Sequence, residues 1–316
     1  MPANAPLHRP ILGVLLKLAA VVLLSSMSAC VKYLGKGVPM GETIFVRGLI
    51  AVLALALIAH QTVGLRVLKT DNWQRHARRS LSGTISMFCL FAALTMIPLA
   101  DVTAISFTSP MFVTILAMLF LGERIHAFRW TALGIGLAGV IVMLAPHLGE
   151  RADLPGNQQL GIGIAFGAAI FSAFAMMFLR KMSGGEHAIT ITFYFMLTSM
   201  LCSLLTLPWG WIVPNREQML VLLLTGAFGV SGQLLMTFSY RYAEASTIAP
   251  LDYTAMIMSV LLGYLFFSEL PSWSTWVGAP LVMASGLIIF WREYRLQRLT
   301  SASLARDLVN RTPTTQ

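Results

Sequence analysis

Runs of about 20 apolar residues recur along this chain, and they constrain its fold more than any other feature. One α-helix needs about 20 such residues to cross roughly 30 Å of hydrocarbon. Only 11% of the 316 residues are charged, whereas about 25% are charged in soluble domains. The sequence therefore predicts an all-α integral membrane protein with ten transmembrane helices. The expected spans are roughly 11–34, 39–60, 80–97, 100–121, 128–146, 160–181, 188–212, 217–238, 245–268 and 274–292.

The chain also repeats itself at half its length. A shift of 146 residues brings a Leu-Phe-x-x-Glu-x6-Trp pattern in the first half onto the same pattern in the second half. We expect two five-helix repeats, 10–146 and 158–292, followed by a basic cytoplasmic tail at 293–316. The matched positions are Thr108 and Thr254, Leu119 and Leu265, Phe120 and Phe266, Glu123 and Glu269, and Trp130 and Trp276.

Positive charge is distributed unevenly between the two sides of the membrane. If the N-terminus is cytoplasmic, sixteen Lys and Arg residues lie on the inner side, four lie on the outer side and two lie within spans. This bias follows the positive-inside rule, so we expect both termini in the cytoplasm. The outer four are Lys32, Lys36, Arg151 and Arg216.

An odd number of spans in each repeat makes the second repeat enter the membrane in the opposite orientation. Inverted repeats in transporters enclose a substrate site between them and support alternating access. The formal net charge of +9 is explained by the same cytoplasmic bias, so no nucleic-acid partner is expected. The expected partners are a small-molecule substrate and the lipid bilayer.

Enzymatic chemistry is not supported by the residues. Cys30, Cys89 and Cys202 lie singly in spans without a CxxC pattern, so neither a disulfide framework nor a thiolate metal site is indicated. We expect no cofactor, no metal and no catalytic residue. No GxxxxGK[ST] motif is present, so this chain does not hydrolyse ATP, and the sequence implies no ATPase subunit. Gly134, Gly136 and Gly139 match GxGxxG inside an apolar span, and we interpret them as helix-packing points.

Charged residues within the spans are the main candidates for a functional site. An acid inside the bilayer is costly unless it is paired or hydrated, so Asp252 indicates a site. The alternative is that Asp252 pairs with Lys17, Arg47 or Arg241 and holds helices together. Lys17 lies about two turns from the cytoplasmic end of its span and can instead snorkel. Arg47 needs an acid from another helix or an anionic substrate group.

Hydroxyl and aromatic residues complete the expected site. Under the repeat, Asp252 falls on Ser106 and Tyr253 falls on Phe107, so one half has a charge where the other has a hydroxyl. Aromatic rings can form an adaptable cavity wall. The predicted substrate-binding residues are Lys17, Arg47, Phe91, Ser106, Phe107, Phe171, Gln233, Tyr240, Asp252 and Tyr253.

These features together resemble the drug/metabolite transporter superfamily, EamA type. The resemblance rests on the five-plus-five duplication, Arg47 early in the second span, and a Gly-rich span after each repeated Glu. It also rests on the motifs Pro98-Leu-Ala-Asp-Val, Thr108-Ser-Pro110 and Leu121-Gly-Glu-Arg124. The second half departs from the pattern, with Ser268-Glu-Leu-Pro271 in place of Gly-Glu-Arg and Met256 at the position of Pro110.

The resemblance implies a bacterial inner-membrane carrier with a central cavity and with the fifth and tenth helices outside it. Such carriers often export amino acids or related metabolites, and the aromatic-rich spans look most like the branch that exports aromatic amino acids. We therefore expect export of small amphipathic metabolites, with Arg47 or Lys17 at the substrate carboxylate and Asp252 at its ammonium group. The alternatives are an importer or exchanger of a larger compound, nucleoside-like or S-adenosylmethionine-like, and a channel or scaffold that is not a carrier.

Overall fold

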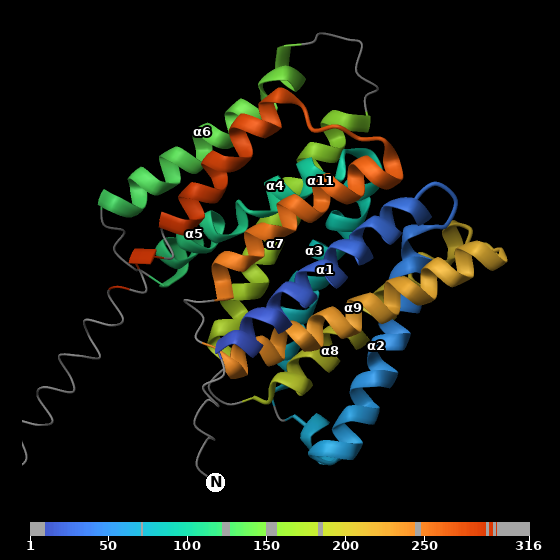
Figure 1. The fold of residues 1–316 in the computed structure, drawn as a ribbon. Helices are drawn as coiled ribbons and strands as arrows, with labels where there is room; N and C mark the ends of the chain where they lie inside the picture. Colours follow the sequence, from blue (N-terminus) through green and yellow to red (C-terminus); the bar gives the residue numbers. More distant parts are fainter. Residues whose placement is uncertain are drawn as a thin grey trace, which may run out of the picture.

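The structure is a computed structural model that describes residues 10–70, 72–121, 127–149, 157–182, 186–243, 248–288, 291, 292 and 295. In this part of the chain, seven helices are long and apolar enough to span a membrane, and three shorter apolar helices accompany them. The helices form an all-α bundle (Figure 1). The predicted all-α membrane fold is therefore confirmed.

The helices follow the expected spans closely in both halves. The first half contains α1 (Pro10–Leu34), α2 (Met40–Thr62), η1 (Leu65–Leu68), α3 (Trp73–Met96), α4 (Leu99–Ser106), α5 (Ser109–Leu121) and α6 (Ala127–Gly149). The second half contains α7 (Asn157–Met182), α8 (Ala188–Leu204), η2 (Leu207–Trp209), α9 (Arg216–Tyr242), η3 (Ala249–Tyr253), α11 (Thr254–Phe267) and a final apolar helix, Trp273–Ile288. Glu123 and the expected tail, apart from Arg295, lie outside the described residues.

Two helix ends differ from the expected spans. α3 begins at Trp73 rather than near residue 80, because hydropathy detects only its apolar part while the helix continues through the basic residues before it. α8 ends at Leu204 rather than near residue 212. Pro208 cannot continue a helix, and the left-handed Gly210 (φ 86°) closes the 3-10 turn that follows.

The two halves pack as an inverted repeat. α1 packs along α9, and the repeat-related pair, α7 and α3, packs in the same way. α2 and α8, which are equivalent under the repeat, pack against each other. In Figure 1, α1 lies beside α9 and α11, so helices of the two halves alternate across the bundle. The interface between the halves therefore runs through the whole bundle.

Both halves interrupt a membrane helix at the same repeat position. The predicted span 100–121 is divided into α4 and α5 by a turn at Phe107 and Thr108. The related segment changes from the 3-10 helix η3 to α11 between Tyr253 and Thr254. Each threonine hydroxyl donates to the carbonyl oxygen three residues earlier at 2.6 Å, Thr108 to Ile105 and Thr254 to Leu251. Discontinuous helices of this kind form binding sites in transporters.

The loop before α3 is held against the start of α8 by polar contacts. The Thr190 hydroxyl donates to the Val67 carbonyl oxygen at 2.7 Å, and the Tyr194 hydroxyl donates to the Leu68 carbonyl oxygen at 3.0 Å. Glu186 lies 3.5 Å from His76 Nε2. Burial opposes ionisation of Glu186, but hydrogen bonds from Thr70 and Asn72 and the adjacent His76 lower its pKa overall. The loop between α2 and α3 is therefore partly packed against α8.

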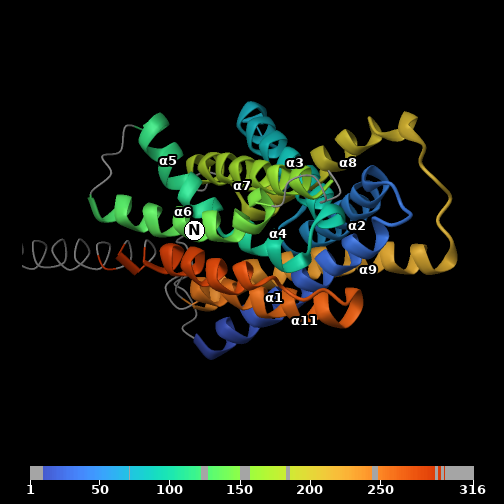
Figure 2. The same cartoon turned by 90° about the horizontal axis from the view of Figure 1, so that it is seen from above.

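Small residues bring α6 and the final helix into close contact (Figures 1 and 2). The Ser285 hydroxyl donates to the Ala132 carbonyl oxygen at 2.7 Å, and Gly139 lies against Gly278. The shift of 146 residues converts one of these contacts into the other, as an inverted repeat requires. Gly139 is therefore a packing point as predicted, whereas a Cβ at Gly134 would meet nothing within 4 Å.

We predict that Gly139→Ala destabilises the protein while Gly134→Ala does not. A Cβ at Gly139 would lie 2.7 Å from the Gly278 carbonyl oxygen, and overpacking of this kind costs about 1–3 kcal/mol. At Gly134, alanine has space and raises helix propensity by up to about 1 kcal/mol. Thermal unfolding of the purified variants in detergent measures the difference. Equal melting temperatures would contradict the assigned helix contact.

Candidate functional site

Three of the predicted site residues meet where α1, α9 and η3 come together. Lys17 Nζ lies 2.7 Å from Asp252 Oδ1 and 5.1 Å from the ring centre of Tyr240. The Lys17 side chain is fully buried, whereas 42% of the Asp252 side chain remains exposed. Lys17 therefore does not snorkel. It forms the ion pair that the sequence left as one of three alternatives for Asp252.

The exposure of Asp252 allows a ligand to reach it. A buried ammonium group is strongly destabilised without a counter-charge, so Asp252 compensates Lys17. Asp252 lies in η3, just before the helix interruption, and its carboxylate has a second oxygen and additional lone pairs for hydrogen bonds. The pair thus presents a partly accessible acid beside an inaccessible cation.

The next two predicted residues lie on the repeat axis. The rings of Phe107 and Tyr253 are 5.0 Å apart in an edge-to-face arrangement. These two residues exchange under the repeat, so the axis that relates the halves passes between them. Ser106, the counterpart of Asp252, donates its hydroxyl hydrogen bond to the Val102 carbonyl oxygen of its own helix at 2.8 Å. The axis therefore has a charged side and a neutral side.

Arg47 and Phe91 form a second group of predicted residues. The Arg47 guanidinium carbon lies 5.8 Å from the Phe91 ring centre, and Nη1 lies 2.7 Å from Met87 Sδ. Arg47 is 7% exposed, and its Nε has no hydrogen-bond partner. None of the three ion pairs found among the described residues includes Arg47. A buried guanidinium with unused donors is suited to an anionic or carbonyl group of a ligand.

Positions along α1 and α9 show how far Arg47 lies from the Lys17–Asp252 pair. A Cβ at Gly229 would lie 2.9 Å from Arg47 Nε and 3.0 Å from Met27 Sδ. The Arg47 side chain is therefore at the same height along the bundle as Gly229 of α9 and Met27 of α1. Met27 is ten residues from Lys17 on α1, and Gly229 is eleven from Tyr240 on α9. At 1.5 Å per residue these separations are about 15 Å and about 17 Å. The structure thus brings Asp252 to Lys17 but not to Arg47.

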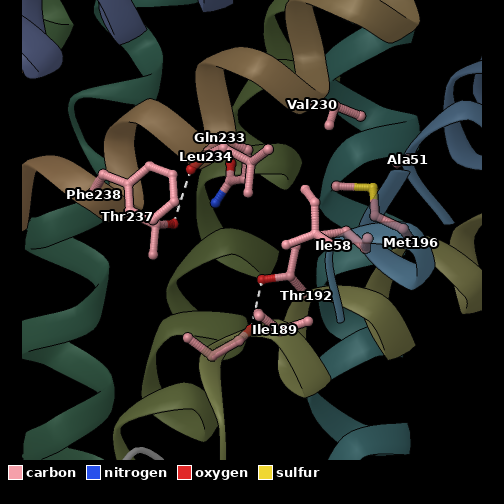
Figure 3. A pocket seen from close by; sticks show the side chains of 12 residues that line it. Ala51, Ile58, Ile189, Thr192, Met196, Val230, Gln233, Leu234, Thr237 and Phe238 are labelled. Carbon is pink, nitrogen blue, oxygen red and sulfur yellow. Dashed lines mark hydrogen bonds between the residues drawn. The ribbon is translucent and has the colours of Figure 1, made fainter. Parts of the chain in front are cut away.

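The remaining predicted residues, Phe171 and Gln233, have other surroundings. The Phe171 ring centre is 6.4 Å from that of Phe174, which belongs to the apolar contact between α5 and α7. Gln233 lines a small pocket of about 70 Å³ between α2, α8 and α9. Figure 3 shows its side chain among apolar neighbours such as Ile58 and Leu234. We therefore leave Phe171 out of the site proposed below, whereas Gln233 lies one helix turn from Gly229, which faces Arg47.

Met87 was missing from the predicted site. It lies four residues before Phe91 and therefore on the same face of α3. That spacing was visible in the sequence, but nothing there indicated that the face turns toward Arg47. The structure also contains, within its described residues, no cluster of three or more His, Cys, Asp or Glu that could hold a metal ion.

Comparisons with known proteins point to transport. The EamA-like transporter family matches residues 11–145 and 159–291. A riboflavin transporter of Rhizobium johnstonii is 30% identical over 75% of this chain and 76% of its own length. The pseudopaline exporter CntI of Pseudomonas aeruginosa is 30% identical over 86% of this chain and 94% of its own length. An S-adenosylmethionine uptake transporter of Rickettsia conorii is 28% identical over 87% and 91%.

A solved crystal structure shares the fold. It superposes with a TM-score of 0.61, covers 90% of this chain and 98% of its own, and is 19% identical in sequence. At this identity the likeness supports the architecture alone.

We predict that Asp252→Ala destabilises the protein more than Lys17→Ala does. Loss of Asp252 leaves a fully buried ammonium group without its counter-charge, a change that costs about 3–5 kcal/mol. Loss of Lys17 leaves a carboxylate that is partly exposed. Thermal unfolding in detergent compares the two variants with Lys17→Ala/Asp252→Ala, which we expect to be more stable than Asp252→Ala. The reverse order of the single variants would show that the buried pair is not the stabilising interaction.

Proposed function

This chain belongs to the EamA-like transporter family, and we propose that it is a secondary carrier for an elongated metabolite with polar groups at both ends. One end of the substrate would bind Asp252, and the other would bind Arg47. The carrier would work by alternating access in a bacterial inner membrane, with both termini in the cytoplasm. The absence of a nucleotide-binding motif from the sequence favours a solute gradient as the energy source.

The separation of the two groups supports this substrate class. The level of the Lys17–Asp252 pair and the level of Arg47 are about 15 to 17 Å apart along α1 and α9, whereas the ammonium and carboxylate of an α-amino acid are attached to the same carbon. One α-amino acid therefore does not bridge the two groups. Riboflavin and S-adenosylmethionine, named for two of the relatives, are both larger than a single amino acid.

The aromatic and thioether residues beside each group suit the apolar part of such a substrate. Phe107 and Tyr253 lie beside Asp252, and Phe91 and Met87 lie beside Arg47. Aromatic rings and thioethers stack on planar or apolar groups without strict geometry. Polar recognition at the ends with adaptable contact between them is consistent with relatives that carry different compounds.

Amino-acid export is the second candidate. The observation that favours it is the Lys17–Asp252 pair, whose opposite charges lie 2.7 Å apart. Once α1 moves away from η3 and exposes Lys17, an α-amino acid can replace this ion pair with two of its own, carboxylate to Lys17 and ammonium to Asp252. Arg47 would then have no direct contact with the substrate, contrary to one of the two sequence-based poses.

The substrate class can be tested with transport in proteoliposomes. We expect saturable uptake of riboflavin or S-adenosylmethionine and no saturable uptake of phenylalanine. Saturable flux of phenylalanine alone would replace the proposal with the amino-acid candidate. Flux that rises linearly with concentration for every compound would indicate a channel.

We further predict that linear ω-amino acids inhibit transport more strongly as their length approaches the distance between Asp252 and Arg47. In Arg47→Ala the longest inhibitors should lose about tenfold or more in affinity, because a hydrogen bond to a charged group contributes about 1.5–3 kcal/mol. Arg75→Ala is the matched control, since Arg75 lies at the exposed start of α3. An inhibition series without length dependence in the wild type would refute the two-ended site.

A further inference from the structure

A second ion pair joins α1 to the opposite end of α11. Lys32 Nζ lies 2.8 Å from Glu269 Oε1, and Lys32 is 9% exposed. Its ammonium group also lies 5.6 Å from the Phe267 ring centre. Lys32 is in the last turn of α1, and Glu269 follows the end of α11. The same two segments that meet through Lys17 and Asp252 thus meet again at their other ends.

This ion pair also caps two further helix ends. Lys32 Nζ donates to the Ile97 carbonyl oxygen at 2.6 Å, at the C-terminus of α3. The Leu99 backbone N–H, at the N-terminus of α4, donates to Glu269 Oε2 at 3.1 Å. Pro98 precedes that N-terminus and has no side-chain acceptor for it. A cation at a helix C-terminus and an anion at an N-terminus each complement the helix dipole.

The two ion pairs lie on either side of the Arg47 level. Lys17, Met27 and Lys32 follow one another along α1, and Met27 marks the level of Arg47. Lys17 and Lys32 are fifteen residues apart, which is about 22 Å along the helix. This distance covers most of the roughly 30 Å of hydrocarbon. A substrate at Arg47 therefore lies between two closed polar contacts.

The repeat keeps the acid of this arrangement but not the other charges. Glu123 corresponds to Glu269 and lies outside the described residues. Gly163 stands at the position of Lys17, Ser106 at that of Asp252, and Phe178 at that of Lys32. The contact between α5 and α7 is apolar, with Phe174 and Phe178 packed against Val113, Leu116 and Ala173. Among the described residues, the lysine and the Asp252 carboxylate of the charged closure therefore belong to the α1 and α11 side alone.

We propose that Lys32 and Glu269 are positioning residues that close one end of the transport path, and that α1 must separate from α11 there for substrate to pass. The inference rests on the proposed carrier function. A partly buried ion pair with two backbone partners resists small displacements, because intermediate positions lose hydrogen bonds before water can replace them. The contact consequently has an open and a closed state, as alternating access needs.

Cysteine accessibility tests this closure without a transported substrate. In a variant with Cys30, Cys89 and Cys202 replaced by alanine, Met27→Cys places one thiol at the Arg47 level. A membrane-impermeant methanethiosulfonate is added to the full-length protein in vesicles, from each side in turn. We expect Glu269→Gln, and independently Lys32→Met, to raise the labelling rate about tenfold from the Glu269 side only, as expected for loss of a charge-assisted hydrogen bond.

Glu217→Gln is the matched control. Glu217 accepts a hydrogen bond from Tyr33, which is adjacent to Lys32 in sequence, but this contact is exposed. We expect labelling in this variant to equal that of the parent. Unchanged labelling in both Glu269→Gln and Lys32→Met, with melting temperatures that show folded protein, would overturn the proposal. Faster labelling without any detectable transport would instead leave the closure in place and refute the carrier function.

The charge-swapped variant Lys32→Glu/Glu269→Lys tests the helix caps. It restores two opposite charges, but a glutamate cannot donate to the Ile97 carbonyl oxygen and a lysine cannot accept from the Leu99 N–H. We therefore expect labelling to stay fast. Slow labelling at the parent rate would show that charge attraction alone closes this end, and the role given to the two helix ends would be wrong.

Discussion

A buried charge in a membrane must find a counter-charge or a hydrated cavity, and this constraint organises the contact between the two halves. α1 carries two lysines into the protein, one buried completely and one almost completely. Their acids, Asp252 and Glu269, flank α11, which belongs to the other half. Since isolated charges in hydrocarbon cost several kcal/mol, these two pairs determine how α1 and α11 align. Hydrophobic burial alone does not impose such alignment, because it has no direction.

The inverted repeat places two helix interruptions side by side, and residue differences between the repeats make the site between them asymmetric. Both halves interrupt a helix at the same position and form the same threonine hydrogen bond there. Phe107 and Tyr253 meet on the axis between the interruptions. Beside them, Asp252 differs from its counterpart Ser106 by a charge. A symmetric scaffold thereby provides a site with one charged side, which a substrate can approach in only one orientation.

The sequence predicted the membrane fold because length and polarity determine whether a segment can span a bilayer. It also identified Asp252 and offered Lys17 as its partner, since few charges occur within the spans. It did not predict the turn at Phe107, because a helix interruption inside an apolar run leaves hydropathy unchanged. It included Phe171 by residue type, and residue type does not determine which way a helix face turns. The Glu269 repeat was visible, but its link to Lys32 and Leu99 depends on packing between distant segments.

In the proposed site, Lys17 couples substrate binding at Asp252 to movement of α1. A cationic group that binds Asp252 competes with the fully buried ammonium group of Lys17 for the same negative charge. Lys17 is then less stable in its buried position, since a buried ammonium group needs a counter-charge or water. Reaching water requires α1 to move away from η3, and the same helix carries Lys32 at its other end. Occupation of Asp252 and the alignment of α1 with α11 therefore compete, and this competition gives a ligand the differential affinity for two states that any conformational change requires.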